Sequence, residues 1–224
     1  HAVAQAQAAL ADFVGDALVL YGDTPFIRPD TLEAMIEARQ THDIVVLGFE
    51  AEEPARYGRL ILKGGQLDRI VEYKDATDDE RAVTLCNSGV IAADAATLFD
   101  LVAAIGNDNA AGEYYLTDII AIARARGLTA TVVECAEAET LGINSRFELA
   151  QAEALFQNAA RMTALDDGVT LIAPETVYFA YDTVIGRDAV IEPNVVFGPG
   201  VTVESGATIR AFSHLEGCHV SRGA

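Results

Sequence analysis

The chain has 224 residues, 34 of them acidic and 15 basic, so its formal charge is −19. With 51% hydrophobic residues, this length is typical of one or two globular domains and not of a disordered chain. The acidic balance argues against a nucleic-acid partner, whose surfaces need clustered Lys and Arg, and no apolar run approaches the roughly 18 residues of a membrane span. Three widely spaced cysteines without a CxxC pair favour a reducing, cytoplasmic compartment.

Residues 1–144 alternate between helical and strand patterns. In chain order, these patterns predict a helix at 2–14, a strand at 17–23, a helix at 29–40, a strand at 43–50, a hairpin at 58–73, a strand at 87–94, helices at 95–105 and 117–126, and a strand at 129–136. The strand at 43–50 is continuously apolar, as in a parallel sheet covered on both faces. We expect the hairpin to turn at Gly64-Gly65 and Asp30 to cap the second helix. The alternation predicts an α/β domain with a small antiparallel insertion.

A long helical pattern follows, with the sequence SRFELAQAEALFQNAARM. Ser145 and Glu148 have the spacing of a capping box. An apolar stripe runs along the same segment, formed by Leu149, Ala152, Leu155 and Phe156. We therefore predict a linker helix at 145–163, between a first domain at 1–144 and a second domain at 164–224.

A six-residue repeat begins after Gly168. Large apolar residues recur at Ile185, Ile191, Phe197, Val203, Ile209 and Leu215. Small or β-branched residues form a second series at Ala189, Val195, Val201, Ala207 and Ser213. Six residues per face and three faces per coil predict a triangular parallel β-helix, with a β-rich meander as the alternative. Only about two coils fit in the chain, so we expect the solenoid to continue beyond it.

Several sequence motifs follow one another in a fixed order: YGDTPFI, YGRLI, IVEYKDAT, NSGVIAAD, GEYYLTDIIAIA and LGINSR. Together with the predicted architecture, they resemble the bacterial bifunctional N-acetylglucosamine-1-phosphate uridylyltransferase/glucosamine-1-phosphate acetyltransferase family, over nearly the whole chain. The resemblance implies a Rossmann-like nucleotidyltransferase domain, joined by a helix to a left-handed β-helix that assembles as a homotrimer. We expect both domains to be partial in this chain.

The resemblance also implies two reactions. The C-terminal part of the family acetylates glucosamine-1-phosphate with acetyl-CoA. The N-terminal part, with Mg²⁺, transfers UMP from UTP to N-acetylglucosamine-1-phosphate, which gives pyrophosphate and UDP-N-acetylglucosamine, a precursor of peptidoglycan and lipopolysaccharide. The family's Gly-rich pyrophosphate loop and its acetyltransferase residues fall outside this chain, so we expect neither reaction at a useful rate from these residues alone.

The YGD motif offers a metal ligand. Tyr21, Gly22 and Asp23 lie at the end of a predicted strand, where an open α/β sheet binds its ligands. From the residues alone, Asp23 either binds a metal ion or forms a turn. The resemblance implies that it binds Mg²⁺ together with Asn144, which could otherwise simply precede the linker helix. Carboxylate and amide oxygens suit Mg²⁺, whose other positions the substrate phosphates and water would take.

Gly58, Glu72 and Asn87 are the remaining substrate-binding candidates. By themselves they could be a turn before a strand, a solvated hairpin residue and the start of a strand. The resemblance implies that Gly58 lets the backbone approach the sugar, and that Glu72 and both ends of the Asn87 amide bond its hydroxyls. The GEYYLTD motif either borders this pocket or caps the next helix through Thr117 or Asp118.

No convincing pair of nucleophile and base occurs, and the implied in-line transfer needs none. Cys86 reads as a core residue. His214, Cys218 and His219 read as solenoid positions, with a metal site as the alternative. Two rivals stay open: another sugar-1-phosphate nucleotidyltransferase with a hexapeptide tail, and a non-catalytic scaffold subunit of the same architecture.

Overall fold

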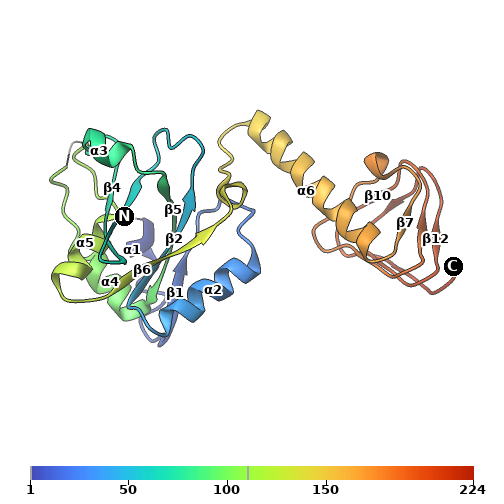
Figure 1. Ribbon diagram of the computed structural model, residues 1–224. Coiled ribbons are helices and arrows are strands. Elements are labelled where there is room, and N and C mark those ends of the chain that lie inside the picture. The colour runs from blue at the N-terminus through green and yellow to red at the C-terminus, as the bar shows by residue number, and fades with distance from the viewer. Residues whose placement is uncertain (1, 110) are drawn as a thin grey trace. The chain divides into compact units, whose positions relative to one another are not determined.

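The computed structural model describes residues 2–109 and 111–224 (Figure 1). The chain divides into two compact units, His1–Gly142 and Ile143–Ala224, and each is described by itself. The predicted division after residue 144 falls close to this boundary. None of the described helices is both long and apolar enough to cross a membrane.

The first unit is built on a six-stranded mixed sheet. Its strands are β1 (Asp16–Val19), β2 (Ile44–Glu50), β3 (Arg59–Lys63), β4 (Gln66–Val71), β5 (Leu85–Asp94) and β6 (Ala130–Cys135). The strand order is β4-β3-β5-β2-β6, and β1 pairs with the end of β5. β2 runs parallel to β6 and antiparallel to β5. The predicted α/β class is confirmed, but the apolar β2 lies in a mixed sheet and not in a purely parallel one.

Helices cover both faces of this sheet (Figure 1). They are α1 (Ala2–Gln5), α2 (Pro29–Arg39), α3 (Asp78–Arg81), α4 (Ala95–Val102), α5 (Asp118–Ala125) and the 3₁₀ turn η1 (Glu137–Thr140). Because side chains alternate along a strand, Ile44 and Val46 of β2 enter the core beneath α4 and α5, and Val45 and Leu47 enter a second core with Met35 of α2. The strand is therefore buried on both faces, as predicted.

The hairpin prediction is confirmed. β3 and β4 are antiparallel and are joined by Gly64 and Gly65, whose φ angles are 61° and 80°. Two successive positive φ angles are typical of the type I′ turn that joins such strands, and glycine adopts them without strain.

Two helical predictions are wrong. The helix expected at 2–14 is regular only at Ala2–Gln5, after which the chain continues in turns. Asp30 does not cap α2, because the helix already begins at Pro29, whose fixed φ suits the first helical position. Asp30 lies inside the first turn and pairs with the Arg28 side chain.

The second unit begins with the helix α6, Arg146–Asp166. This helix covers the predicted linker segment except for its first residue, Ser145, which is the N-cap, and it runs past residue 163. Ser145 caps it as predicted, because its hydroxyl accepts a hydrogen bond from Glu148 N–H at 3.2 Å.

The face of α6 that packs within the second unit differs from the predicted stripe. Ala152 is buried, whereas Leu149 and Leu155 are 54% and 52% exposed. A polar side chain makes the main contact: the Gln157 amide accepts from Phe179 N–H at 2.9 Å and donates to Phe179 O at 2.8 Å. The apolar pattern alone could not indicate this contact.

Short parallel strands form three narrow sheets in the remainder of the second unit. The strands are β7 (Thr170–Leu171), β8 (Val184–Ile185), β9 (Val190–Ile191), β10 (Val196–Phe197), β11 (Thr202–Val203), β12 (Thr208–Ile209), β13 (His214–Leu215) and β14 (His219–Val220). A 3₁₀ turn, η2 (Pro174–Thr176), lies between β7 and β8. Pairs such as Val190↔Thr208 and Val184↔Thr202 lie one three-faced coil apart. The predicted parallel β-helix is confirmed, and its left hand stays a prediction.

The large residues of the repeat point inward, as expected. Ile191, Phe197 and Val203 are at most 2% exposed. The last described coil is shorter than the earlier ones. Val203 pairs with Val220, and these two residues are one position closer in the sequence than the paired residues of the earlier coils. Cys218 thereby packs against the core of the coil.

Candidate functional site

Gly58 lies at the centre of the predicted sugar-binding residues. It immediately precedes β3, whose first residue pairs with β4 on one side and β5 on the other. Continuing both antiparallel registers by one residue sets Gly58 opposite Glu72 and Asn87, and opposed residues share one face of the sheet. A Cβ added to Gly58 would lie 3.6 Å from both Asn87 Cβ and Glu72 Oε1. Two polar side chains, those of Glu72 and Asn87, therefore flank a position that has no side chain.

Glu72 is oriented by the GEYYLTD motif. Its Oε1 accepts a hydrogen bond from the Thr117 hydroxyl at 3.1 Å, and Thr117 is 6% exposed. Thr117 precedes α5 but makes no capping bond with its side chain, so the capping alternative is wrong for this residue. Glu72 Oε2 makes no hydrogen bond within the described part of the chain, which leaves it as an acceptor for a ligand.

The Asn87 side chain is fixed by its own strand. Its Oδ1 accepts a hydrogen bond from Gly89 N–H at 3.1 Å. The Nδ2 amide group has no hydrogen-bond partner among the described residues. One of the two acceptor positions of Asn87 Oδ1 is thus filled, and its Nδ2 group can donate to a ligand. Binding of a hydroxyl through both amide ends stays a prediction. One acceptor and one donor at the Gly58 gap match the two hydrogen-bonding roles of a sugar hydroxyl.

Tyr21 packs against β5 next to these residues. Gly89 has a φ of 89°, and a Cβ there would come within 2.2 Å of the Tyr21 ring. The ring therefore occupies the space that a side chain at position 89 would need. Burial raises the pKa of Tyr21, and the charges of Glu72 and Asp23 raise it further. Tyr21 is accordingly a neutral phenol near neutral pH, within electrostatic reach of both acids.

Gly22 and Asp23 lie in the exposed turn that follows β1. The N–H and the hydroxyl of Thr24 both donate to Tyr21 O, at 3.3 Å and 3.0 Å, and these bonds close the turn. The Asp23 carboxylate takes no part in them and bonds no other described residue. The turn therefore forms without the help of the Asp23 side chain. Its carboxylate, which bonds no other described residue, is suited to be a metal ligand.

Asn144 belongs to the second unit and precedes the Ser145 cap. Its backbone N–H donates to Glu148 Oε2 at 2.7 Å. This bond to the carboxylate lowers the pKa of Glu148, and the interaction of the Ser145 hydroxyl with the same carboxylate lowers it further. The start of α6 thus uses the Asn144 backbone and leaves its side-chain amide without a partner among the described residues. A carboxylate and an amide oxygen suit Mg²⁺, and their sharing of one ion stays a prediction.

A cavity of about 400 Å³ opens beside Glu72. Its lining consists of Arg56, Glu72, Tyr73, Lys74, Glu113 and Tyr115. Burial raises the pKa of Tyr115, with nearby acids including Glu72 adding to the effect. The two basic residues supply the local positive charge that a phosphate-bearing ligand needs in an acidic protein. The sequence prediction did not include Arg56 or Tyr115, although the GEYYLTD motif pointed to the latter.

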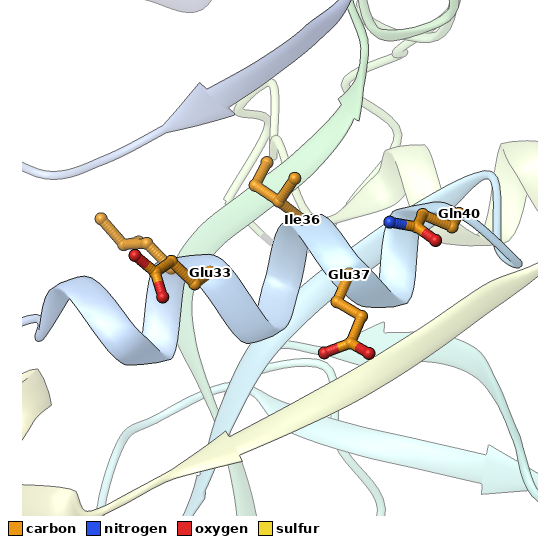
Figure 2. A pocket seen from close by; sticks show the side chains of 5 residues that line it. Glu33, Ile36, Glu37 and Gln40 are labelled. Atoms are coloured by element: carbon orange, nitrogen blue, oxygen red, sulfur yellow. The ribbon is translucent and has the colours of Figure 1, made fainter.

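A second hollow, of about 430 Å³, lies on α2. Figure 2 shows Glu33, Ile36, Glu37 and Gln40 along one side of this helix, and Leu32 completes the lining. None of the predicted site residues lies there. Its apolar floor and two glutamates are unsuited to a phosphate-bearing sugar, so we do not assign it to the site.

The metal alternative for the HLEGCH segment finds no support. Nowhere in residues 2–109 and 111–224 do three or more His, Cys, Asp or Glu side chains form a group that could hold a metal ion. His219 pairs with Glu204 at 3.0 Å, and Cys218 packs into the coil. Cys86 is fully buried, and burial raises the pKa of its thiol, so the expectation of a core residue is confirmed.

Comparison with known proteins places these features in a family. Residues 182–217 match the family model described as "Bacterial transferase hexapeptide (six repeats)". The chain is 68% identical over all 224 residues to the "Bifunctional protein GlmU" of Roseobacter denitrificans. It is 70% identical, again over its full length, to the proteins of that name from Cereibacter sphaeroides and Ruegeria pomeroyi. The chain belongs to the GlmU family.

The chain covers 50% of the Roseobacter and Ruegeria GlmU proteins and 49% of the Cereibacter protein. It therefore spans about half the length of the curated GlmU relatives. The fold of the first unit also occurs beyond GlmU. A solved structure of CMP:2-keto-3-deoxy-manno-octonic acid synthetase complexed with CTP matches with a TM-score of 0.50 and 15% identity, over 71% of this chain and 69% of that chain. At that identity, the match shows a shared fold alone.

Proposed function

We propose that the chain contributes the Mg²⁺-dependent uridylyltransferase site of a bifunctional GlmU protein. The reaction transfers UMP from UTP to N-acetylglucosamine-1-phosphate and gives UDP-N-acetylglucosamine and pyrophosphate. The identity of 68–70% to GlmU relatives, over the whole length of this chain, supports the family-level part of this proposal. The chain has both residues to which the family resemblance assigns the metal, Asp23 and Asn144, and their presence favours an active enzyme over a scaffold.

The observation that carries the proposal is the gap at Gly58. Glu72 and Asn87 flank it on one face of the sheet, one with an acceptor oxygen and the other with a donor group that no other described residue bonds. Neither the packing nor a positive φ requires glycine at this position. A polar ring that enters between the two side chains would explain why the position is empty.

The chemistry we propose uses no protein nucleophile. A phosphate oxygen of the sugar 1-phosphate forms a bond to the α-phosphorus of UTP, and the bond to pyrophosphate breaks in line. Glu72 and Asn87 orient the sugar, and Arg56 and Lys74 draw its phosphate toward the cavity. Asp23 and Asn144 would hold Mg²⁺, which, when bound, neutralises charge on the phosphates.

The second unit is proposed to begin the acetyltransferase domain of the parent protein. The family model for hexapeptide transferases matches residues 182–217, and acetyl-CoA would be the acetyl donor for glucosamine-1-phosphate. We further propose a cytoplasmic homotrimer, because flat solenoid faces suit packing between identical copies. UDP-N-acetylglucosamine made by such a protein would supply peptidoglycan and lipopolysaccharide synthesis.

The test is pyrophosphate release by the full-length protein with UTP and Mg²⁺. We expect turnover with N-acetylglucosamine-1-phosphate and much less with glucose-1-phosphate. Glu72→Ala should lower kcat/KM for the acetylated sugar by about 10–100-fold, because a bound hydroxyl loses its partner. Glu134→Ala, which removes an exposed acid on β6, is the matched control and should stay near the wild-type value.

Two results would overturn this assignment. Equal rates with both sugars would indicate a different sugar-1-phosphate nucleotidyltransferase. An absence of turnover with every sugar tested, in a folded protein, would indicate the scaffold subunit.

A further inference from the structure

The helix α2 begins without a capping side chain of its own. Arg28 occupies the N-cap position and makes no side-chain capping bond. Its guanidinium turns to Asp30 instead. The free N–H groups at the start of a helix must nevertheless find acceptors.

A carboxylate from the other end of the first unit supplies that acceptor. Glu139 Oε2, in η1, accepts hydrogen bonds from Arg28 N–H at 3.1 Å and from the Thr31 hydroxyl at 2.7 Å. Glu139 is only 7% exposed and forms no ion pair within the described part of the chain. A buried carboxylate is costly unless such bonds compensate it, and the positive end of a helix favours it.

These bonds fix one end of the loop that carries Asp23. The loop leaves β1 at Val19, which pairs with β5, and Tyr21 packs against Gly89. At its far end, Glu139 holds Arg28 and the first turn of α2. The exposed Asp23 turn thus lies between two anchored ends, and its own bonds close only the local turn.

The same turn also reaches the loop that leads to Gly58. Glu137 Oε2 accepts a hydrogen bond from Glu52 N–H at 3.4 Å. Along the chain, η1 is followed after a few residues by Asn144. One short segment is therefore bonded to the loop with Asp23 and to the loop with Gly58.

We propose that Glu139 is a positioning residue, which fixes the Asp23 loop so that its carboxylate is held ready for a divalent cation. Glu139 touches neither substrate nor metal and acts through the backbone of Arg28 and the hydroxyl of Thr31. The metal role of the loop rests on the proposed function, whereas the anchoring of the loop does not.

The experiment compares Glu139→Ala and Glu139→Gln in the full-length protein. A glutamine oxygen can accept both hydrogen bonds, so Glu139→Gln should behave like the wild type. Glu139→Ala should speed amide hydrogen exchange in residues 20–31 and raise the Mg²⁺ concentration for half-maximal rate by about tenfold, the effect typical of losing a group that orients a metal ligand. The KM for N-acetylglucosamine-1-phosphate should change less than about twofold, since Gly58, Glu72 and Asn87 keep their strand pairing. Glu134→Ala is the control for removing one acid from the same region.

Three outcomes would overturn the proposal. Unchanged exchange in residues 20–31 of Glu139→Ala would show that the loop does not depend on this carboxylate. Equal changes in the Mg²⁺ midpoint and the sugar KM would indicate general destabilisation. A glutamine variant as impaired as the alanine variant would show that charge, and not the two hydrogen bonds, matters. If the wild type lacked Mg²⁺-dependent turnover, the proposed function would fail, and the exchange data would still decide whether Glu139 anchors the loop.

Discussion

Two glycines in the first unit owe their identity to different causes. At Gly89, both the positive φ and the Tyr21 ring exclude a side chain. At Gly58, φ is not positive, and an added Cβ would meet only ordinary contacts, the closest at 3.4 Å from Ile70 Cγ2. The protein's own packing explains the first glycine and does not explain the second.

This difference predicts opposite effects of the two alanine variants. Gly89→Ala should lose about 2 kcal/mol or more of unfolding free energy, because the new side chain is strained and clashes with Tyr21. Gly58→Ala should keep the wild-type melting temperature but raise the KM for the sugar phosphate by about tenfold, because it narrows the gap beside Glu72. Thermal melts and steady-state kinetics on the full-length protein measure both.

The kinetic half of this prediction has a clear counter-result. A Gly58→Ala variant with both normal stability and a normal sugar KM would show that no ligand enters the gap.

At the residue scale, motifs in the sequence identified the polar side chains but not their hydrogen bonds. Glu72 and Asn87 could be named from IVEYKDAT and NSGVIAAD, and the sheet register then placed both beside Gly58. The bond from Thr117 to Glu72 joins residues 45 positions apart, so no local pattern could show it. For the same reason, Thr117 was equally acceptable as a helix cap.

At the element scale, predictions were accurate where one periodicity governs a segment. The continuous apolar run of β2, the Gly-Gly turn and the hexads are patterns within one segment, and the burial of β2 on both faces, the hairpin and the inward-facing hexad residues were each confirmed. They failed where a distant partner decides, as at the start of α2, which Glu139 caps from far along the chain. The Ala-rich segment at 2–14 likewise has helical composition without the packing that stabilises a helix.

In the short helix α3, the ionisation of Glu80 should make the stability of the fold depend on pH. Glu80 Oε2 accepts from Thr77 N–H at 2.8 Å, and Glu80 pairs with Arg69 at 2.7 Å. The Thr77 backbone bond first, and Arg69 next, lower the pKa of Glu80 from 4.5 to about 2. Because the folded pKa lies below the unfolded one, ionised Glu80 stabilises the fold above pH 4.5, and this contribution is lost as the pH falls toward 2.

Glu80→Gln should therefore be less stable than the wild type at neutral pH, with a difference that shrinks as the pH falls below 4.5. Denaturant unfolding at a series of pH values measures it. Asp79→Asn, which neutralises an exposed acid of the same helix, is the matched control variant. A difference between Glu80→Gln and wild type that stays constant down to pH 2 would contradict the role assigned to this carboxylate.

At the scale of the whole molecule, an α/β unit and a hexapeptide β-helix unit follow one another in one chain. Both classes could be predicted because their patterns span many residues, and the structure confirms the order in which the two units follow one another. A shared metal ion is a different kind of claim, because it links Asp23 in the first unit to Asn144 in the second. Local sequence patterns carry no information on how far apart two side chains lie when their residues are distant in the sequence.

A double-mutant cycle on Mg²⁺ affinity tests this link most directly. Pyrophosphate release by full-length wild type, Asp23→Ala, Asn144→Ala and the double variant would be titrated with Mg²⁺. If both side chains bind one ion, each single variant weakens Mg²⁺ binding and the double variant loses less than the sum, with a coupling free energy of about 1–3 kcal/mol. Additive losses, or an unchanged Mg²⁺ dependence in either single variant, would contradict the account.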